Sequence, residues 1–154
     1  MATDSSPEDL KWMRLAIELS HKCPPSENAY SVGAVIVDEH GREMARGYSR
    51  ETDPRQHAEE AALAKLPPGD PRLRTATIYS SLEPCSTRKS RPKPCAQHIL
   101  DAGIPRVVIA WREPGLFVNC EGVELLTAAG VTVTELPQLA EEARTANTHL
   151  PLET

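Results

Sequence analysis

The chain has 154 residues, which is enough for one domain that buries a hydrophobic core and too few for two full domains. Hydrophobic residues make up 40% of it and charged residues 25%, without an apolar run long enough to cross a membrane, so we expect a globular protein with no membrane partner. The net charge of −5 argues against a general nucleic-acid binder, because such a protein needs a broad basic face.

The first elements expected are a helix and a hairpin. Residues 6–22 have the pattern of an amphipathic helix, with Ser6 able to cap it and Pro7 suited to its first position. The β-branched apolar run 32–37 is too short for a helix and predicts a buried strand. A turn leads from it to a partner strand at 43–49, so we expect a β-hairpin.

The rest of the chain alternates between helix and strand. Helices are predicted from residue 56 or 57 to 65 and at 95–102, 122–129 and 137–147, and strands at 75–80, 106–111 and 131–135. A hairpin followed by strands that join through crossover helices predicts an α/β fold, a three-layer α/β/α sandwich with a five-stranded mixed sheet. We expect one domain over residues 7–149, with flexible ends at 1–6 and 150–154.

The cysteines indicate metal binding or burial rather than disulfides. Residues 1–7 contain neither a basic cluster nor the apolar segment of a targeting signal, so we expect a cytoplasmic protein. Disulfides are rare in that compartment. Cys85 and Cys95 are candidate metal ligands, whereas Cys23 and Cys120 are interpreted as ordinary core or surface thiols.

One histidine and two cysteines predict a zinc site. His57, Cys85 and Cys95 offer imidazole and thiolates, which Zn²⁺ prefers, and three protein ligands leave the fourth tetrahedral position open for water. Two alternatives are a purely structural zinc site, which would be one ligand short, and plain buried thiols beside a histidine at a helix start. Zinc can lower the pKa of a water so that it supplies hydroxide, and a carboxylate that is not a ligand can then carry the proton.

Two carboxylates after His57 compete for that proton-transfer role. Residues two apart on an ideal helix point about 200° apart, so helix geometry alone favours Glu60 over Glu59 on the face of His57. This geometry is weak in the first turn, where His57 can still have capping geometry. The residues themselves therefore leave the choice open.

The order of these residues resembles the signature of zinc-dependent deaminases, which is His-x-Glu followed by Pro-Cys-x-x-Cys. Here it consists of His57-Ala58-Glu59, then Pro84-Cys85, then Cys95, with nine residues between the cysteines. The resemblance implies that the histidine and the cysteines hold Zn²⁺ and that Glu59 is the catalytic acid and base.

Longer motifs make the chain similar to one branch of the cytidine deaminase-like superfamily. It looks most like the deaminase domain of the bifunctional riboflavin-biosynthesis deaminase/reductases. The matching stretches cover most of the chain: 32–37, 57–59, 81–86, 91–95, 120–126, 129–131 and 142–147. The resemblance implies a three-layer fold, assembly as a homodimer or homotetramer, and hydrolytic deamination of an amino-pyrimidine. The substrate that this resemblance favours is the diaminohydroxyphosphoribosylaminopyrimidine of riboflavin biosynthesis.

Departures from that branch keep other functions open. Residues 29–31 read Ala-Tyr-Ser where the branch usually has Asn-Pro-x, and the loop between the cysteines is one residue longer. Ser49 stands where this branch tends to have histidine and where tRNA or nucleoside deaminases tend to have asparagine. The chain ends where the reductase domain would begin, so we expect either a separate reductase or another amino-heterocycle. The alternatives are a cytosine, guanine or nucleoside deaminase and an inactive, zinc-stabilised interaction module, against which the presence of Glu59 argues.

Candidate substrate contacts surround the predicted metal site. The cysteine loop carries cations that suit a phosphate group, or that only keep a solvated loop soluble: Arg88, Lys89, Arg91 and Lys93. Trp111 could stack on a flat heterocycle, or simply pack over the sheet edge. Ser49 and Ala58 complete the expected set, and the expected partner is a small molecule rather than nucleic acid.

Overall fold

The computed structural model describes residues 6–24, 26, 29–85, 94–112 and 121–149. The strands are β1 (Gly33–Val37), β2 (Glu43–Tyr48), β3 (Thr77–Ser80), β4 (Arg106–Ile109) and β5 (Thr132–Glu135). The α-helices are α1 (Pro7–Ser20), α2 (Ala58–Leu63), α3 (Cys95–Ala102), α4 (Gly122–Ala128) and α5 (Ala140–Arg144). Short 3₁₀ helices lie at Pro71–Thr75, Pro137–Leu139 and Thr145–Asn147.

The strands form one five-stranded mixed sheet in the order β2-β1-β3-β4-β5. β1 pairs antiparallel with both β2 and β3, whereas β3, β4 and β5 run parallel. The antiparallel pair β1–β2 is the expected hairpin, and α3 and α4 make the crossovers between the parallel strands, as parallel pairing requires. The predicted five-stranded mixed sheet is therefore confirmed.

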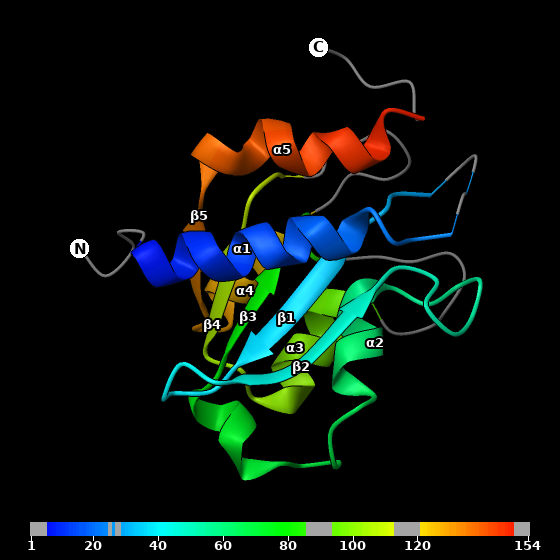
Figure 1. Ribbon diagram of the computed structural model, residues 1–154. Coiled ribbons are helices and arrows are strands. Elements are labelled where there is room, and N and C mark those ends of the chain that lie inside the picture. Colours follow the sequence, from blue (N-terminus) through cyan, green and yellow to red (C-terminus); the bar gives the residue numbers. More distant parts are fainter. Residues whose placement is uncertain (1–5, 25, 27–28, 86–93, 113–120, 150–154) are drawn as a thin grey trace.

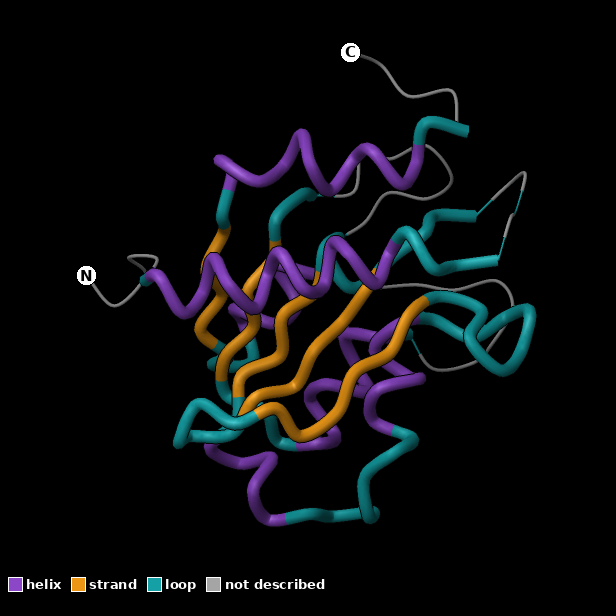
Figure 2. The backbone as a smooth tube through the Cα atoms, in the orientation of Figure 1, coloured by secondary structure: helices purple, strands orange, loops and turns teal. Residues whose placement is uncertain are grey.

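Helices cover both faces of this sheet (Figures 1 and 2). α1 crosses one face, and α5 packs beside it. Ala143 of α5 and Leu139 of the preceding 3₁₀ helix share a buried cluster with Trp12. α2, α3 and α4 cover the opposite face, where their apolar side chains join those of the sheet. The arrangement is the three-layer α/β/α sandwich that the sequence predicted.

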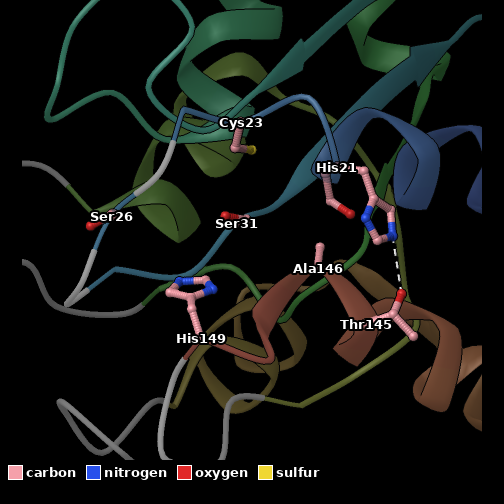
Figure 3. Close-up of a pocket in the computed structure, with 8 residues that line it drawn as sticks. His21, Cys23, Ser26, Ser31, Thr145, Ala146 and His149 are labelled. Atoms are coloured by element: carbon pink, nitrogen blue, oxygen red, sulfur yellow. Dashed lines mark hydrogen bonds between the residues drawn. The ribbon is translucent and has the colours of Figure 1, made fainter.

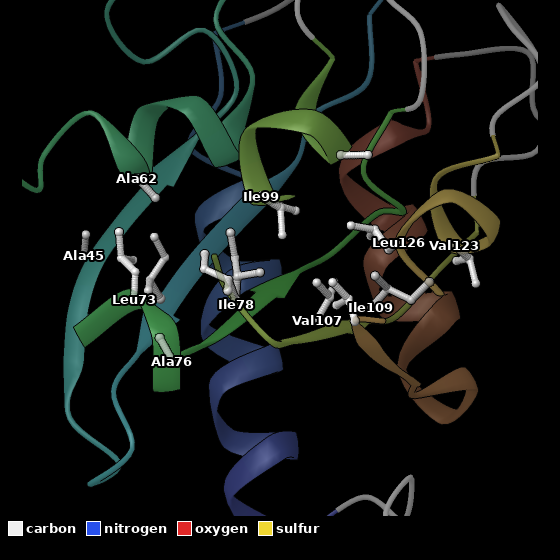
Figure 4. Packing of buried hydrophobic residues seen from close by; sticks show 14 residues of the cluster. Ala45, Ala62, Leu73, Ala76, Ile78, Ile99, Val107, Ile109, Val123 and Leu126 are labelled. Carbon is white, nitrogen blue, oxygen red and sulfur yellow. The ribbon is translucent and has the colours of Figure 1, made fainter. Parts of the chain in front are cut away.

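The pleat of the strands divides the core in two. Alternate residues of a strand point to opposite faces, so Ile78 and Val107 pack under α2–α4, while Tyr79 and Val108 face α1 and α5. Figure 4 shows the first of these clusters, in which Ile78 and Val107 lie close to Ile99 of α3. Both faces of the sheet are thus fixed by apolar packing.

The longest helix, α1, begins as its residues require. The Ser6 hydroxyl accepts the Asp9 N–H at 3.1 Å, and the Asp9 carboxylate accepts the Ser6 N–H at 3.3 Å, a capping box with Pro7 in the first position. Within the described part of the chain, no helix combines the length and apolarity needed to cross a membrane.

Element ends differ from the predicted ones where short 3₁₀ helices replace regular structure. A strand was expected from residue 75, but Asp70 caps a 3₁₀ helix at Pro71–Thr75 by accepting the Arg72 N–H at 3.0 Å, so β3 begins only at Thr77. The predicted C-terminal helix at 137–147 is divided into 3₁₀, α and 3₁₀ segments, since the ends of short helices often tighten into 3₁₀ turns.

Candidate metal centre

Three potential ligands from different elements meet beyond the carboxyl end of β3. His57 directly precedes α2, Cys85 follows β3, and Cys95 is the first residue of α3. Their ligand atoms all lie within 4.8 Å of one another, and His57 and Cys85 are only partly buried while Cys95 is fully buried. The sequence separates these residues by up to 38 positions, and the fold joins them.

The distances fit a tetrahedral zinc ion. His57 Nδ1 lies 3.2 Å from Cys95 Sγ and 3.6 Å from Cys85 Sγ. Zinc–nitrogen and zinc–sulfur bonds of about 2.0 and about 2.3 Å at a tetrahedral angle put such atoms about 3.5 Å apart. One imidazole and two thiolates are also the donors of catalytic zinc sites that keep a position open. The residues therefore fit Zn²⁺.

The helices reach this point because glycine lets α2 lie directly on the sheet. A Cβ on Gly47 of β2 would lie 2.5 Å from the backbone nitrogen of Ala62 and 2.7 Å from the Ala61 Cβ, closer than atoms can pack. A larger residue there would push α2 outward and carry His57 away from the cysteines. Gly47 thus sets the height of the histidine ligand above the sheet.

The two cysteines are tied together by the start of α3. The Cys95 N–H points to the Cys85 sulfur at 3.2 Å, and the Ala96 N–H donates to the Cys85 carbonyl at 3.0 Å. The hydrogen bond with the Cys95 side chain is the largest influence that lowers the pKa of Cys85, to about 4, against the opposing effect of burial and with further help from His57. The thiolate form that metals bind is therefore favoured before any metal arrives.

The two carboxylates after His57 differ in their geometry at the start of α2. His57 has extended backbone (φ −92°, ψ 161°) and is the residue before the helix, so regular helix geometry does not apply between it and Glu59. Glu60 instead accepts the His57 N–H at 2.9 Å and lies 3.6 Å from His98. Glu60 is thus occupied in starting the helix, and Glu59 is the carboxylate that points inward.

Glu59 is buried beside the ligands. Its side chain is 3% exposed, and the Ser80 hydroxyl lies 3.0 Å from its Oε2 atom. Burial raises the pKa of Glu59; the charge of His57 acts against this rise and the charge of Cys85 adds to it. A carboxyl group held in this way takes up a proton more readily than an exposed one, as a proton carrier must.

Two further buried polar residues, which the sequence did not single out, support the site. Ser80 ends β3 beneath Glu59, and Glu83 accepts the Val123 N–H at 2.9 Å and so anchors α4. A Cβ on Gly122 would lie 1.9 Å from the Pro84 carbonyl, so α4 presses directly on the chain that leads to Cys85. The position of Glu83 immediately before Pro84-Cys85 was the available hint, since a charged residue between a buried strand and a ligand needs a partner.

The predicted substrate contacts fall into two groups. Ala58 is fully buried against Val32 and Leu82, and Ser49 uses its hydroxyl to accept the Val32 N–H at 3.0 Å. Trp111 is partly buried, and its ring meets that of Tyr30 edge-on at 5.8 Å. Their contacts with substrate remain predictions. The remaining candidates lie outside the described residues: Arg88, Lys89, Arg91 and Lys93.

An α/β/α sandwich that brings one imidazole, two thiolates and a buried carboxylate together has the architecture and the residues of a zinc-dependent deaminase. The family model of the cytidine and deoxycytidylate deaminase zinc-binding region matches residues 6–111. The chain belongs to this family.

Similar proteins in this family include deaminases of the riboflavin-biosynthesis branch. The diaminohydroxyphosphoribosylamino-pyrimidine deaminase of Schizosaccharomyces pombe is 42% identical over 127 residues, which cover 81% of this chain and 31% of the relative. RibD of Acinetobacter baumannii has a structure of TM-score 0.77 and 31% identity, covering 91% of this chain and 38% of the other. The Aspergillus oryzae Rib2 deaminase in complex with DARIPP has a TM-score of 0.77 at 27% identity, covering 90% and 89%.

The expected resemblance to riboflavin-biosynthesis deaminases is therefore confirmed, as is the cytidine deaminase-like fold. The chain spans about a third of the length of the curated relatives it matches, 31% of the Schizosaccharomyces pombe protein and 37% of Aquifex aeolicus RibD.

Proposed function

We propose that this chain is a zinc-dependent hydrolytic deaminase whose substrate is diaminohydroxyphosphoribosylaminopyrimidine. The observation that carries the proposal is the buried Glu59 carboxylate beside the His57, Cys85 and Cys95 ligand set. The choice of substrate is supported by the name of the Schizosaccharomyces pombe relative and by the DARIPP complex of the Aspergillus oryzae deaminase.

In the proposed reaction water replaces the amino group of the ring: a carbon–oxygen bond forms, the carbon–nitrogen bond breaks, and ammonia leaves. Zinc, when bound, lowers the pKa of a water toward neutrality and so supplies the nucleophile. Glu59 accepts the first proton that the water loses and delivers it to the adjacent ring nitrogen; it then accepts the second proton, from the hydroxyl group on the attacked carbon, and delivers it to the leaving amine. Its raised pKa supports the protonated form that each delivery needs.

Ser80 suits both protonation states of Glu59. Its single hydroxyl proton has two acceptors in reach, the Glu59 Oε2 at 3.0 Å and the Leu82 carbonyl at 2.7 Å. The hydroxyl can donate to ionised Glu59, or donate to Leu82 while accepting from protonated Glu59. Ser80 is therefore proposed to keep the carboxyl group in one place while its proton comes and goes.

The test is ammonia release by the zinc-loaded protein from a small set of amino-heterocycles. We expect the highest kcat/KM for the phosphorylated diaminopyrimidine, with its dephosphorylated form, dCMP, cytidine and guanine as comparisons. Turnover restricted to cytidine, dCMP or guanine would favour the alternative of a cytosine, guanine or nucleoside deaminase. Absence of turnover with all of them would contradict the proposed substrate and favour the inactive interaction module.

The proposed phosphate contact can be separated from the chemistry. Replacing Arg91 and Lys93 with alanine is expected to raise KM for the phosphorylated substrate and not for its dephosphorylated form. An equal effect on both substrates would contradict a phosphate-binding role for the basic loop.

We also propose that the protein is cytoplasmic and, second, that it assembles as a homodimer or homotetramer. Light scattering coupled to size-exclusion chromatography measures the second directly, and a mass of 16.9 kDa in solution would contradict it.

A further inference from the structure

The motif Glu142-Ala143-Arg144-Thr145-Ala146-Asn147 has no role in the chemistry above, yet its last residue is 1% exposed. Asn147 pairs with the backbone of Ser31, 116 positions earlier, on both sides of its amide. The Ser31 N–H donates to Asn147 Oδ1 at 2.6 Å, and Asn147 Nδ2 donates to the Ser31 carbonyl at 3.0 Å. An amide side chain is needed for this pairing, because one group must accept while the other donates.

The backbone held by Asn147 leads directly into a buried apolar cluster next to the metal ligands, which we call the apolar wall. The next residue, Val32, packs with Ala58 and Leu82, which adjoin the histidine ligand and the strand end that leads to Cys85. Ser49 accepts the Val32 N–H at 3.0 Å, and the following N–H, of Gly33, donates to Ser81 at 3.1 Å. The position of Ser31 therefore determines how Val32 packs against Ala58, the residue before Glu59.

The aromatic pair at this wall is held by the same two segments. Tyr30 precedes Ser31 and meets Trp111 edge-on, while the Arg144 guanidinium lies 5.9 Å from the centre of the Trp111 ring. His149 Nε2 lies 3.0 Å from the Ala29 carbonyl. Residues 144–149 thus form a C-terminal strap along residues 29–31.

Arg50 holds the loop from the other side. Its guanidinium donates to the Tyr30 carbonyl at 3.0 Å and to the Ser31 hydroxyl at 3.1 Å, from a backbone with φ of +59°. A left-handed conformation is unfavourable for arginine and persists only where surrounding contacts fix it. The loop is thus clamped between Arg50 and the C-terminal strap.

Hydrogen bonds connect the strap to the loop beside a cavity. A cavity of about 240 Å³ lies between them and the end of α1, and its lining includes His21, Cys23, Ser31, Ala146 and His149 (Figure 3). Next to this cavity, the two hydrogen bonds between Asn147 and Ser31 and the contact of His149 with the Ala29 carbonyl tie the strap to the loop.

We infer that Asn147 is a positioning residue of the substrate site: it fixes residues 30–32, and so sets the affinity for substrate, without taking part in proton transfer. The inference rests on the proposed deaminase function. Loss of this tie lets the wall move relative to Ala58, which weakens substrate binding, whereas the zinc ligands and Glu59 stand on other elements and keep their geometry.

The experiment compares steady-state kinetics of the zinc-loaded wild type, Asn147→Asp and a matched control, Thr148→Ala, whose side chain is exposed one residue further on. Asn147→Asp keeps the size of the side chain and removes its donor. We expect KM for the phosphorylated diaminopyrimidine to rise roughly tenfold or more, kcat to stay within about twofold, and zinc content to be unchanged. Thr148→Ala should match the wild type in all three.

A fall in kcat at constant KM, or no change in either, would overturn the inference. If Asn147→Asp does not fold, His149→Ala carries the test, because it removes only the exposed tie to Ala29; it should raise KM about twofold to threefold, and an unchanged KM would contradict the strap. A wild type that releases no ammonia from the diaminopyrimidine refutes the proposed function instead, so the two failures are distinguishable.

Discussion

Two carboxylates, Asp9 and Glu59, are equally buried at 3% exposure on opposite faces of the sheet, and their surroundings differ completely. Asp9 accepts two hydrogen bonds from Arg106, at 3.0 and 2.8 Å, and one from the Tyr79 hydroxyl at 2.7 Å. Glu59 has the Ser80 hydroxyl at 3.0 Å and lies beside the metal ligands. One acid is surrounded by donors, and the other is kept available.

The pKa values move in opposite directions for this reason. Burial raises the pKa of Asp9, but the hydrogen bonds from Arg106 and Tyr79 and the charge of Arg106 outweigh burial and lower it overall. At Glu59 burial prevails, and the pKa rises. Burial alone therefore does not determine the direction of a pKa shift; the donors around each carboxylate decide it.

The largest effect that would distinguish Glu59 from Asp9 is expected for Glu59→Gln. Removing the proton carrier is expected to lower kcat by about a hundredfold to ten-thousandfold, with zinc content and melting temperature near those of the wild type. Ammonia release and metal analysis of the same sample measure both. Glu60→Gln is the matched control, because glutamine can still accept the His57 N–H; if it lost as much activity, the assignment to Glu59 would be wrong.

Asp9→Asn tests the other acid, and the expected effect is on stability. The change removes the negative partner of Arg106, whose side chain is 26% exposed, so we expect a loss of about 3 kcal/mol in the free energy of unfolding, at the lower end for a broken buried pair. kcat per folded, zinc-loaded molecule should stay near the wild-type value. Urea unfolding and the ammonia assay separate the two, and a variant as stable as the wild type would refute the structural role of this pair.

Tyr79→Phe is a smaller change at the same place. It removes one hydrogen bond to Asp9 and leaves both bonds from Arg106. We expect a loss of about 1 kcal/mol in the free energy of unfolding. The free energy of unfolding is also measured for the double variant Asp9→Asn/Tyr79→Phe. There the Tyr79 change should lower stability less than it does alone, because Asp9, the acceptor of its hydrogen bond, is already replaced.

The pH dependence of stability gives the smallest and most specific effect. The folded-state pKa of Asp9 is lowered, so its ionised form contributes stability that is fully present above the unfolded value, about 3.9, and is lost as pH falls through the lower folded value. The difference in unfolding free energy between wild type and Asp9→Asn should therefore shrink below about pH 4. A difference that grows toward acid pH would contradict the sign of this shift.

The family and the candidate metal ligands could be predicted from the sequence because the evidence for them is local. His57, Cys85 and Cys95 are residue types with a narrow chemistry, and a capping Ser6 or a β-branched run such as 32–37 forms the same element in most contexts. The mixed sheet followed from the order of elements alone. The choice of Glu59 over Glu60 needed the family pattern, because the cap geometry of His57 cannot be deduced from residue spacing.

Long-range hydrogen bonds could not be predicted in this way. Asn147 and Ser31, or Asp9 and Arg106, are separated by 116 and 97 positions, and polar residues of these types are usually exposed. Nothing in their immediate neighbours indicates burial or a partner. The 3₁₀ helix at Pro71–Thr75 was missed for a different reason, since its capping residue Asp70 lies among turn-forming prolines that predict only a loop.

The most direct measurement of the central claim is ammonia release from the phosphorylated diaminopyrimidine as zinc is added back to metal-free protein. The account predicts that activity rises in proportion to zinc and stops rising at one ion per chain in the wild type, and that Glu59→Gln binds the same single ion without gaining activity. Full activity in metal-free protein, or activity that returns with zinc in Glu59→Gln, would contradict it.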